Sequence, residues 1–188
     1  ALRRVAEGGF ASLTMQALAE DVGVATGSLY RHFRSKGELA AEVFAMASRR
    51  EVEALAAAFA ASGRPSERLA QGILQFAARA WHSRQLAFAL IAEPVEPEVD
   101  EQRLFYREAY ADLFCSLLEE GVRSGDFQVE QLRLVAACLV GAIAESLVGP
   151  LSPPARTARK AGGAVLGFAD ASRNLITSCL RAVGAKGY

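Results

Sequence analysis

Apolar residues recur at intervals of three and four along almost the whole chain, which is the period of an α-helix that buries one face. The clearest repeat lies between residues 130 and 148 and consists of Leu132, Val135, Leu139, Val140, Ile143 and Leu147. No stretch shows clearly the strict alternation of apolar and polar residues that is typical of a half-buried strand. The pattern therefore predicts an all-α protein.

Capping residues and helix breakers divide this pattern into about nine helices. Thr14 and Ser35 are placed to cap the helices that follow them, and Ser35 forms a capping box with Glu38. The predicted helices cover approximately residues 2–8, 15–22, 26–33, 35–62, 66–82, 84–93, 99–124, 130–148 and 165–183. Before the last helix, residues 149–154 are predicted to break the chain and residues 157–163 to form a mobile basic segment.

Helix length changes along the chain, since three short predicted helices precede six longer ones. The change falls along the helix predicted at 35–62, near residue 45. We therefore expect a small head over residues 1–45 and a larger body over residues 46–188, with that helix as the connector.

Composition narrows the possible chemistry of the protein. Three cysteines (Cys115, Cys138 and Cys179) lie far apart without a CxxC motif, and His32 and His82 are the only histidines. These residues predict neither a zinc site nor a disulfide framework, so we expect no metal and no cofactor.

The termini and the apolar runs bear on location. No unbroken apolar run reaches the ~18 residues of a membrane span, and no signal peptide is visible. We expect a cytoplasmic protein without a membrane partner. The chain begins at Ala1 inside a helical pattern, so residues of the natural protein are expected to precede it.

Charge is balanced overall but not locally. Lysine plus arginine equals aspartate plus glutamate at 21 each, so net charge alone does not indicate a nucleic-acid partner. Residues 22–37, however, contain Arg31, Arg34, Lys36 and His32 and no acid. A basic surface of this kind is suited to an anion, and DNA is a common one.

The same region has the pattern of a helix-turn-helix. "TMQALAEDVGVATGSLYRHF" predicts a helix, a tight turn at Gly23 and a second helix. Six apolar residues are expected to pack the two helices together: Leu18, Ala19, Val22, Val24, Leu29 and Phe33. In this motif the second helix enters the major groove with its N-terminal residues against the base edges, and the small polar Thr26, Gly27 and Ser28 suit that position.

The stretch from Gly8 to Leu39 resembles the TetR family of bacterial transcription regulators. The matching residues are Gly9-Phe10, Thr14, Ala19, Gly23-Val24, Gly27-Ser28-Leu29-Tyr30, His32-Phe33, Ser35-Lys36 and Leu39. Two positions depart from the family pattern. Ala25 replaces the usual polar N-cap, so Thr26 becomes a candidate cap, and Gly37 replaces a longer residue.

The resemblance implies DNA contacts at specific residues. It implies phosphate contacts from Thr14, Tyr30, His32 and Lys36. It implies base or groove contacts from Gln16, Thr26, Gly27, Ser28 and Arg31. Chemistry favours Arg31 and Gln16 as the residues that specify bases, because their side chains pair bidentately with guanine and adenine.

For the body, the resemblance implies dimerisation and effector binding. A single recognition helix reads only a few base pairs, so a two-fold partner is expected, through the helices at 130–148 and 165–183. Small residues on these helices would permit close packing between subunits, namely Ala136, Ala137, Gly141, Ala142, Ala144, Ala169, Ala171 and Ser172. An ordinary intramolecular core is the alternative for the same residues.

Aromatic residues on the middle helices are candidates for an effector pocket. They are Phe76, Trp81, Phe88, Tyr106, Tyr110 and Phe114. They carry no clustered charge, which favours an apolar or weakly polar ligand. The same stripe is also typical of a plain hydrophobic core.

The function predicted from these features is a ligand-responsive repressor, released from a palindromic operator DNA by a small apolar effector. A helical DNA-binding regulator without an effector is one alternative. An all-α enzyme with a site built from His82, Glu93, Tyr106 and Cys115 is another, but the spacing of these residues does not require one. We therefore expect no enzymatic activity.

Overall fold

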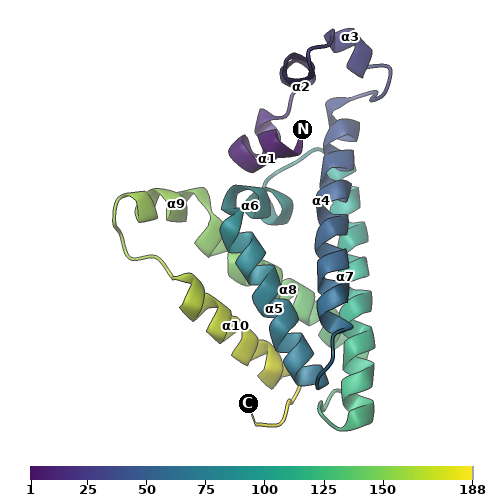
Figure 1. Ribbon diagram of the computed structural model, residues 1–188, viewed down its shortest axis with the longest axis vertical. Coiled ribbons are helices and arrows are strands. Elements are labelled where there is room, and N and C mark those ends of the chain that lie inside the picture. The colour runs from purple at the N-terminus through teal and green to yellow at the C-terminus, as the bar shows by residue number, and fades with distance from the viewer. Residues whose placement is uncertain (188) are drawn as a thin grey trace.

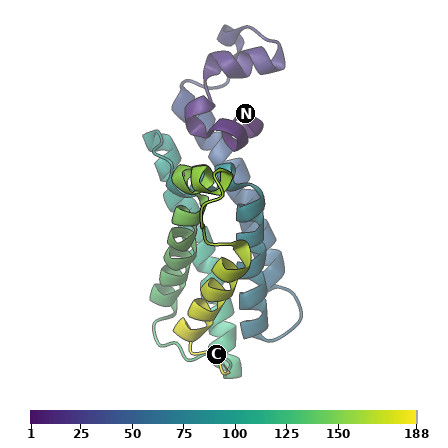
Figure 2. The same ribbon diagram turned by 90° about the vertical axis from the view of Figure 1, so that its left-hand side faces the viewer.

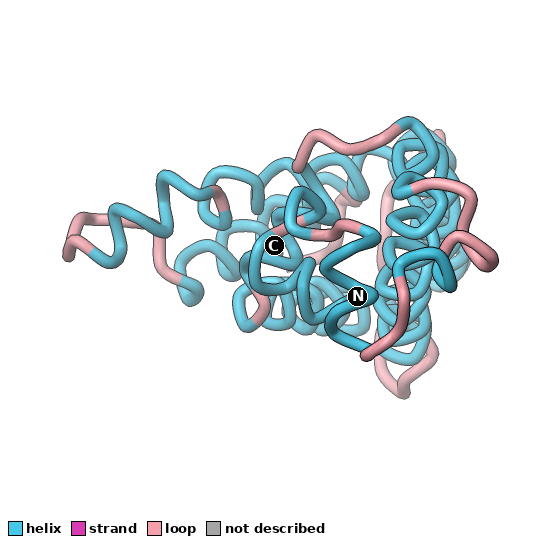
Figure 3. Tube along the Cα trace, turned by 90° about the horizontal axis from the view of Figure 1, so that it is seen from above, coloured by secondary structure: helices cyan, strands magenta, loops and turns pink. Residues whose placement is uncertain are grey.

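The computed structural model describes residues 1–187, which form ten α-helices and one 3-10 helix and contain no strand (Figure 3). The elements in chain order are α1 (Leu2–Gly8), η1 (Phe10–Ser12), α2 (Met15–Val22), α3 (Thr26–Leu29), α4 (Lys36–Phe59), α5 (Pro65–His82), α6 (Arg84–Ala92), α7 (Pro97–Ser124), α8 (Leu132–Leu151), α9 (Pro153–Lys160) and α10 (Phe168–Ala182). The all-α fold expected from the sequence is confirmed.

The helices from α1 to α3 form a head at one end of the molecule, and the C-terminus lies at the opposite end (Figures 1 and 2). The head is held by a cluster of buried residues that includes Val5, Phe10, Leu13 and Leu18 and the N-terminal half of α4. The same cluster continues to Val99 of α7. Head and body are therefore joined by continuous apolar packing as well as by the chain.

Two helices run side by side away from the head: α4, which leaves it, and α7 (Figure 1). Their far ends pack in the main core, where the rings of Phe59 and Phe114 lie 5.1 Å apart. Leu69 and Leu118 are fully buried in the same cluster, and burying each such side chain contributes about 1.5–3 kcal/mol. α5, α8 and α10 complete this core.

The recognition helix is shorter than the sequence predicts. α3 ends at Leu29, and residues 30–32 form a turn instead of continuing to Phe33. Ala25 occupies the N-cap without a side-chain hydrogen bond, so Thr26 is the first helical residue and not the cap. An uncapped start and the low helix propensity of Gly27 both weaken a short helix.

The packing predicted between α2 and α3 is correct only in part. Leu18 and Ala19 are buried, and Leu29 and Phe33 pack against the head cluster. The prediction is wrong for Val22 and Val24, because their side chains are 57% and 45% exposed beside the turn at Gly23.

The region between α8 and α10 also differs from the prediction. α8 continues past Gly149 and Pro150 to Leu151, because Leu147 and Leu151 are buried against Trp81 and extend the helix by packing. The segment expected to lack helix contains α9, which starts at Pro153 with the Ser152 side chain accepting from the Ala155 amide. Proline suits the first turn of a helix, so this stretch was a helix start and not only a break.

Candidate DNA-binding surface and effector cavity

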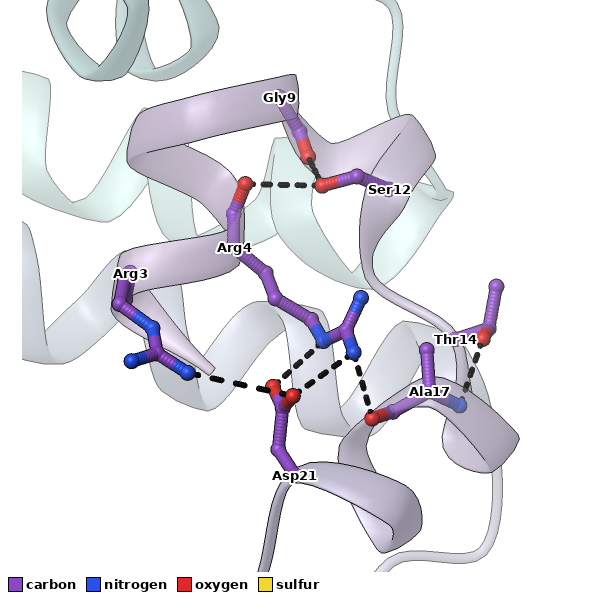
Figure 4. A network of polar contacts seen from close by, with 7 residues as sticks. All are labelled: Arg3, Arg4, Gly9, Ser12, Thr14, Ala17 and Asp21. Atoms are coloured by element: carbon purple, nitrogen blue, oxygen red, sulfur yellow. Dashed lines mark hydrogen bonds and ion pairs between the residues drawn. The ribbon is translucent and has the colours of Figure 1, made fainter.

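An ion pair orients the first helix of the helix-turn-helix (Figure 4). Arg4 of α1 donates from Nε to Asp21 Oδ2 at 2.6 Å and from Nη2 to Asp21 Oδ1 at 2.8 Å. The same guanidinium donates to the Ala17 carbonyl at 2.9 Å. The hydrogen bond from Arg4 holds the pKa of Asp21 below its usual value. This bidentate contact fixes α2 against α1.

A cap and a glycine set the limits of α2. The Thr14 hydroxyl accepts from the Ala17 amide at 3.1 Å. At the other end Gly23 has φ 71°, a left-handed conformation that glycine adopts without a Cβ clash. The Val24 amide donates back to the Ala19 carbonyl at 3.0 Å, which turns the chain toward α3.

Most residues predicted to contact DNA lie at the tip of the head, on and around α2 and α3. Gln16, Gly27, Tyr30, Arg31 and His32 are exposed. Within residues 1–187 the side chains of Tyr30, Arg31 and His32 make no hydrogen bond or ion pair, and a Cβ at Gly27 would meet no atom within 4 Å.

Four of the predicted residues have side chains that are partly buried or already hydrogen-bonded. Thr14 is the exposed cap of α2, while Thr26 and Ser28 are half-buried at the start of α3. Gln16, although exposed, donates to Glu20 on the same helix at 3.1 Å. These contacts are local and leave the polar groups at the surface of the head.

Lys36 lies in a different environment from the one its sequence suggests. Its Nζ lies 2.7 Å from Oε1 of Glu96, in the loop between α6 and α7. Partial burial opposes ionisation of Glu96, but the hydrogen bonds from Lys36 and from its own backbone N–H lower its pKa below the usual range. Glu96 therefore competes with a phosphate for Lys36.

Two further acids, Glu93 in this loop and Glu98 in the first turn of α7, contact the head and the start of α4. Glu93 accepts from the amides of Phe10 and Ala11 at 3.0 and 3.3 Å, beside Gly9. Glu98 lies against Gly37, where an added Cβ would come within 2.6 Å of its carboxylate. Gly37, which departs from the family pattern, thus leaves room for a carboxylate of the body.

A cavity of about 520 Å³ opens in the body, among α4, α5, α6, α7 and α8. This volume is typical of a small-molecule site. Four of the predicted ligand-binding residues line it, namely Phe76, Tyr106, Tyr110 and Phe114, and the rings of Phe76 and Tyr110 lie 6.3 Å apart. Trp81 and Phe88 do not line it, because they pack with Leu147, Leu151 and Phe168 in a separate cluster.

The cavity wall carries charges that the aromatic pattern did not reveal. Arg79 donates to Glu51 at 2.8 Å across α5 and α4. Burial raises the pKa of the neighbouring Tyr110, and the charge of Glu51 adds to that effect. Tyr110 is therefore a neutral hydrogen-bonding group at physiological pH.

Arg103 connects this wall to the end of α6. It donates to the Leu90 carbonyl at 3.1 Å and to the Glu93 carbonyl at 3.0 Å, and its guanidinium lies over the ring of Phe44. The side chain of Glu93 in turn binds the head. The C-terminal end of α6 is therefore bound on one side by Arg103 of the cavity wall and connected on the other side, through Glu93, to the head. Sequence spacing gave no signal for this arrangement.

The outer faces of α8 and α10 are only partly covered. Leu134 is 64% exposed, and Ala137, Gly141, Ala142 and Ala169 are exposed, while Ala136 and Ser172 are buried inside the protomer. In the described chain α8 alone is long and apolar enough to cross a membrane, with a mean hydropathy of 2.0, which by itself is weak evidence for a span.

No group of three histidine, cysteine, aspartate or glutamate side chains within residues 1–187 could hold a metal ion.

The head and the separate helical body define the protein as a helix-turn-helix transcription regulator.

Comparison with known families agrees with this class. The family model for bacterial regulatory proteins of the tetR family matches residues 1–43, and that for the tetracyclin repressor-like C-terminal domain matches residues 62–147. The chain belongs to the TetR family. Members of this family are transcription regulators and not enzymes. No curated protein sequence matches the chain.

Solved structures share the fold. The regulator FadR from Bacillus subtilis, solved with stearoyl-CoA, is 18% identical with a TM-score of 0.77, and the match covers 97% of this chain and 95% of that one. FadR from Bacillus halodurans is 18% identical with a TM-score of 0.73, covering 95% and 93%. Reduced NemR from E. coli is 15% identical with a TM-score of 0.72, covering 100% and 95%. These identities show a common fold and no more.

Proposed function

We propose that the protein is a ligand-responsive repressor that binds a palindromic operator as a homodimer and is released by a small effector with a largely apolar body. The observation that supports this most is the position of the cavity. It is lined by Phe44, Ser48 and Glu51 of α4, the helix whose N-terminus carries the head. A ligand there contacts the helix that positions the DNA-binding surface.

Roles in DNA binding follow from exposure and chemistry. Arg31 and Gln16 read bases, and Thr26, Gly27 and Ser28 allow α3 to approach the groove. Thr14, Tyr30, His32 and Lys36 contact phosphates. On this proposal residues 1–45 form the DNA-binding unit and residues 46–188 the effector and dimerisation unit.

The partner subunit covers the outer faces of α8 and α10. Only 28% of the most apolar 18-residue stretch of α8 is buried in the protomer, which leaves apolar surface for a partner to cover. The exposed small residues allow the helices of two subunits to approach closely, and two-fold symmetry would place one head in each half-site. The location that we propose, on the basis of a DNA-binding role, is the cytoplasm.

The effector acts on α6. Leu86 and Leu90 of α6 line the cavity, and Arg103 links the cavity wall to the α6 carbonyls. A ligand that displaces this end of α6 also moves Glu93, which holds the head at Phe10 and Ala11. The ligand must bind the released state more tightly than the DNA-bound state, because only differential affinity shifts the equilibrium.

Stearoyl-CoA in the B. subtilis FadR structure supports an effector with an apolar chain. A regulator without an effector remains the second candidate, and a cavity-filling variant distinguishes the two.

The test begins with selection of an operator from random DNA and anisotropy titration of that site. Ala144 lines the cavity on α8, so Ala144→Trp should fill it and change operator affinity by about tenfold or more. Ala57→Trp, at an exposed position of α4 outside the cavity, is the control. A selected palindrome with unchanged affinity in Ala144→Trp would favour the regulator without an effector. No enrichment of any site would reject the DNA-binding proposal.

A further inference from the structure

The mouth of the cavity is basic. Four of its lining residues are exposed to solvent and so mark the opening: Ala78, His82, Ser83 and Arg107. Within residues 1–187 the side chains of His82 and Arg107 make no hydrogen bond or ion pair. The opening therefore presents two basic groups without an acidic partner.

Deeper in the wall, positive charge also exceeds negative charge. Among the lining residues the arginines are Arg79, Arg103 and Arg107, and Glu51 is the one carboxylate. Glu51 is paired with Arg79 at 2.8 Å, and Arg103 is paired at 2.6 Å with Asp100, which does not line the cavity. Arg107 is therefore the lining arginine without an ion pair within residues 1–187.

Arg103 and Arg107 are one turn apart on α7 and lie on the same face. Burial lowers the pKa of Arg103, and the charge of Arg107 lowers it further, against the opposing effect of Asp100. Two guanidinium groups that repel one another are stabilised by an anion that contacts both.

We propose that the effector of this cavity is an amphiphilic oxyanion. Its alkyl or aryl body lies against Phe76, Tyr110 and Phe114, and its carboxylate or phosphate binds Arg107 at the mouth with Arg103 behind it. The inference rests on the proposed function in taking this cavity as the effector site. The aromatic residues alone predicted an apolar or weakly polar ligand, and the basic mouth adds the anionic group.

The experiment compares probes that share a body and differ in their end group. Calorimetry measures binding of dodecanoate and dodecyl phosphate below their micelle concentrations and of dodecan-1-ol below its solubility limit. A second pair, 2-naphthylacetate and 2-(2-naphthyl)ethanol, tests an aryl body. In at least one series the oxyanion should bind about tenfold or more tightly than its alcohol, since hydrogen bonds to charged groups are the stronger ones.

Variants test whether the preference for an oxyanion over its alcohol depends on residues at the mouth of the cavity. Arg107→Gln should remove most of it, and His82→Gln should reduce it less. Arg123→Gln, an exposed arginine of α7 outside the cavity, should leave it unchanged. Circular dichroism checks that each surface variant is folded. The probe that binds more tightly, dodecanoate or dodecyl phosphate, identifies the type of oxyanion.

The proposal is overturned if the alcohols bind as tightly as the oxyanions, if Arg107→Gln keeps the preference, or if no probe binds. Operator anisotropy with the same probes separates this result from the proposed function. Selective oxyanion binding with unchanged operator affinity would support the ligand class and reject effector control. Operator release by an alcohol alone would support effector control and reject the anionic end.

Discussion

The head and the body hold their functional groups in opposite ways. At the tip of the head, Tyr30, Arg31 and His32 are exposed, and they come from one short segment of the chain. In the body, the cavity is assembled from α4 to α8, with Glu51 and Arg79 paired across two helices. A DNA surface must keep its donors free, whereas an effector site is enclosed by elements distant in sequence.

This difference predicts that changes to the body can abolish DNA binding without touching the head. Leu134→Glu should introduce a charge into the proposed subunit interface and produce a monomer. Specific operator affinity should then fall toward the non-specific level, about 10³-fold or more. Sedimentation and anisotropy measure the two effects.

Leu104→Glu is the matched control, because Leu104 of α7 is 62% exposed, almost as much as Leu134. This variant should remain dimeric. A Leu134→Glu protein that is still a dimer would place the interface elsewhere.

The body core should be the more sensitive region to truncation. Leu69 is fully buried, so Leu69→Ala should lower the free energy of unfolding by about 2–5 kcal/mol. Leu104→Ala, at an exposed site, should change it by about 0.5 kcal/mol or less. Denaturant titrations compare them, and equal losses would contradict the assigned core.

Within the head, the exposed Arg31 should contribute to the DNA sequence specificity. Arg31→Ala should cost about 1–3 kcal/mol at one base pair and relax selection there. Arg34→Ala should weaken binding evenly across sequences, as expected of a residue near the backbone. Selection profiles from random DNA test this, and an unchanged profile in Arg31→Ala would exclude base reading by Arg31.

The smallest effect is expected where the two regions meet. Glu96→Gln removes the competitor for Lys36, so all DNA sequences should bind a few-fold more tightly, while Lys36→Ala should weaken them and reduce the salt slope. In a Lys36→Ala background, Glu96→Gln should have almost no effect. An equal gain in both backgrounds would mean that Glu96 acts by general repulsion of DNA.

The sequence predicted the fold class because helical periodicity, Thr14 and Ser35 are local signals. The residues that it predicts for DNA binding lie close together in the chain, and most of them are exposed. It did not predict the Lys36–Glu96 pair or the exclusion of Trp81 and Phe88 from the cavity. Those depend on how helices pack, and an aromatic residue at helical spacing suits a core and a pocket equally.

The shortened α3 and the additional α9 have local causes. Ala25 provides no side-chain cap for α3, and Pro153 begins a helix where the sequence pattern predicts a break. Both errors concern helix ends, where one or two residues decide the outcome.

Thermodynamic linkage between the two regions tests the central claim most directly. The tightest oxyanion probe is titrated into free protein and into protein saturated with the selected operator, and operator affinity is measured with and without saturating probe. We predict that operator weakens probe binding and that the probe weakens operator binding by the same factor. Equal probe affinities in the two titrations would contradict effector control of DNA binding by this cavity.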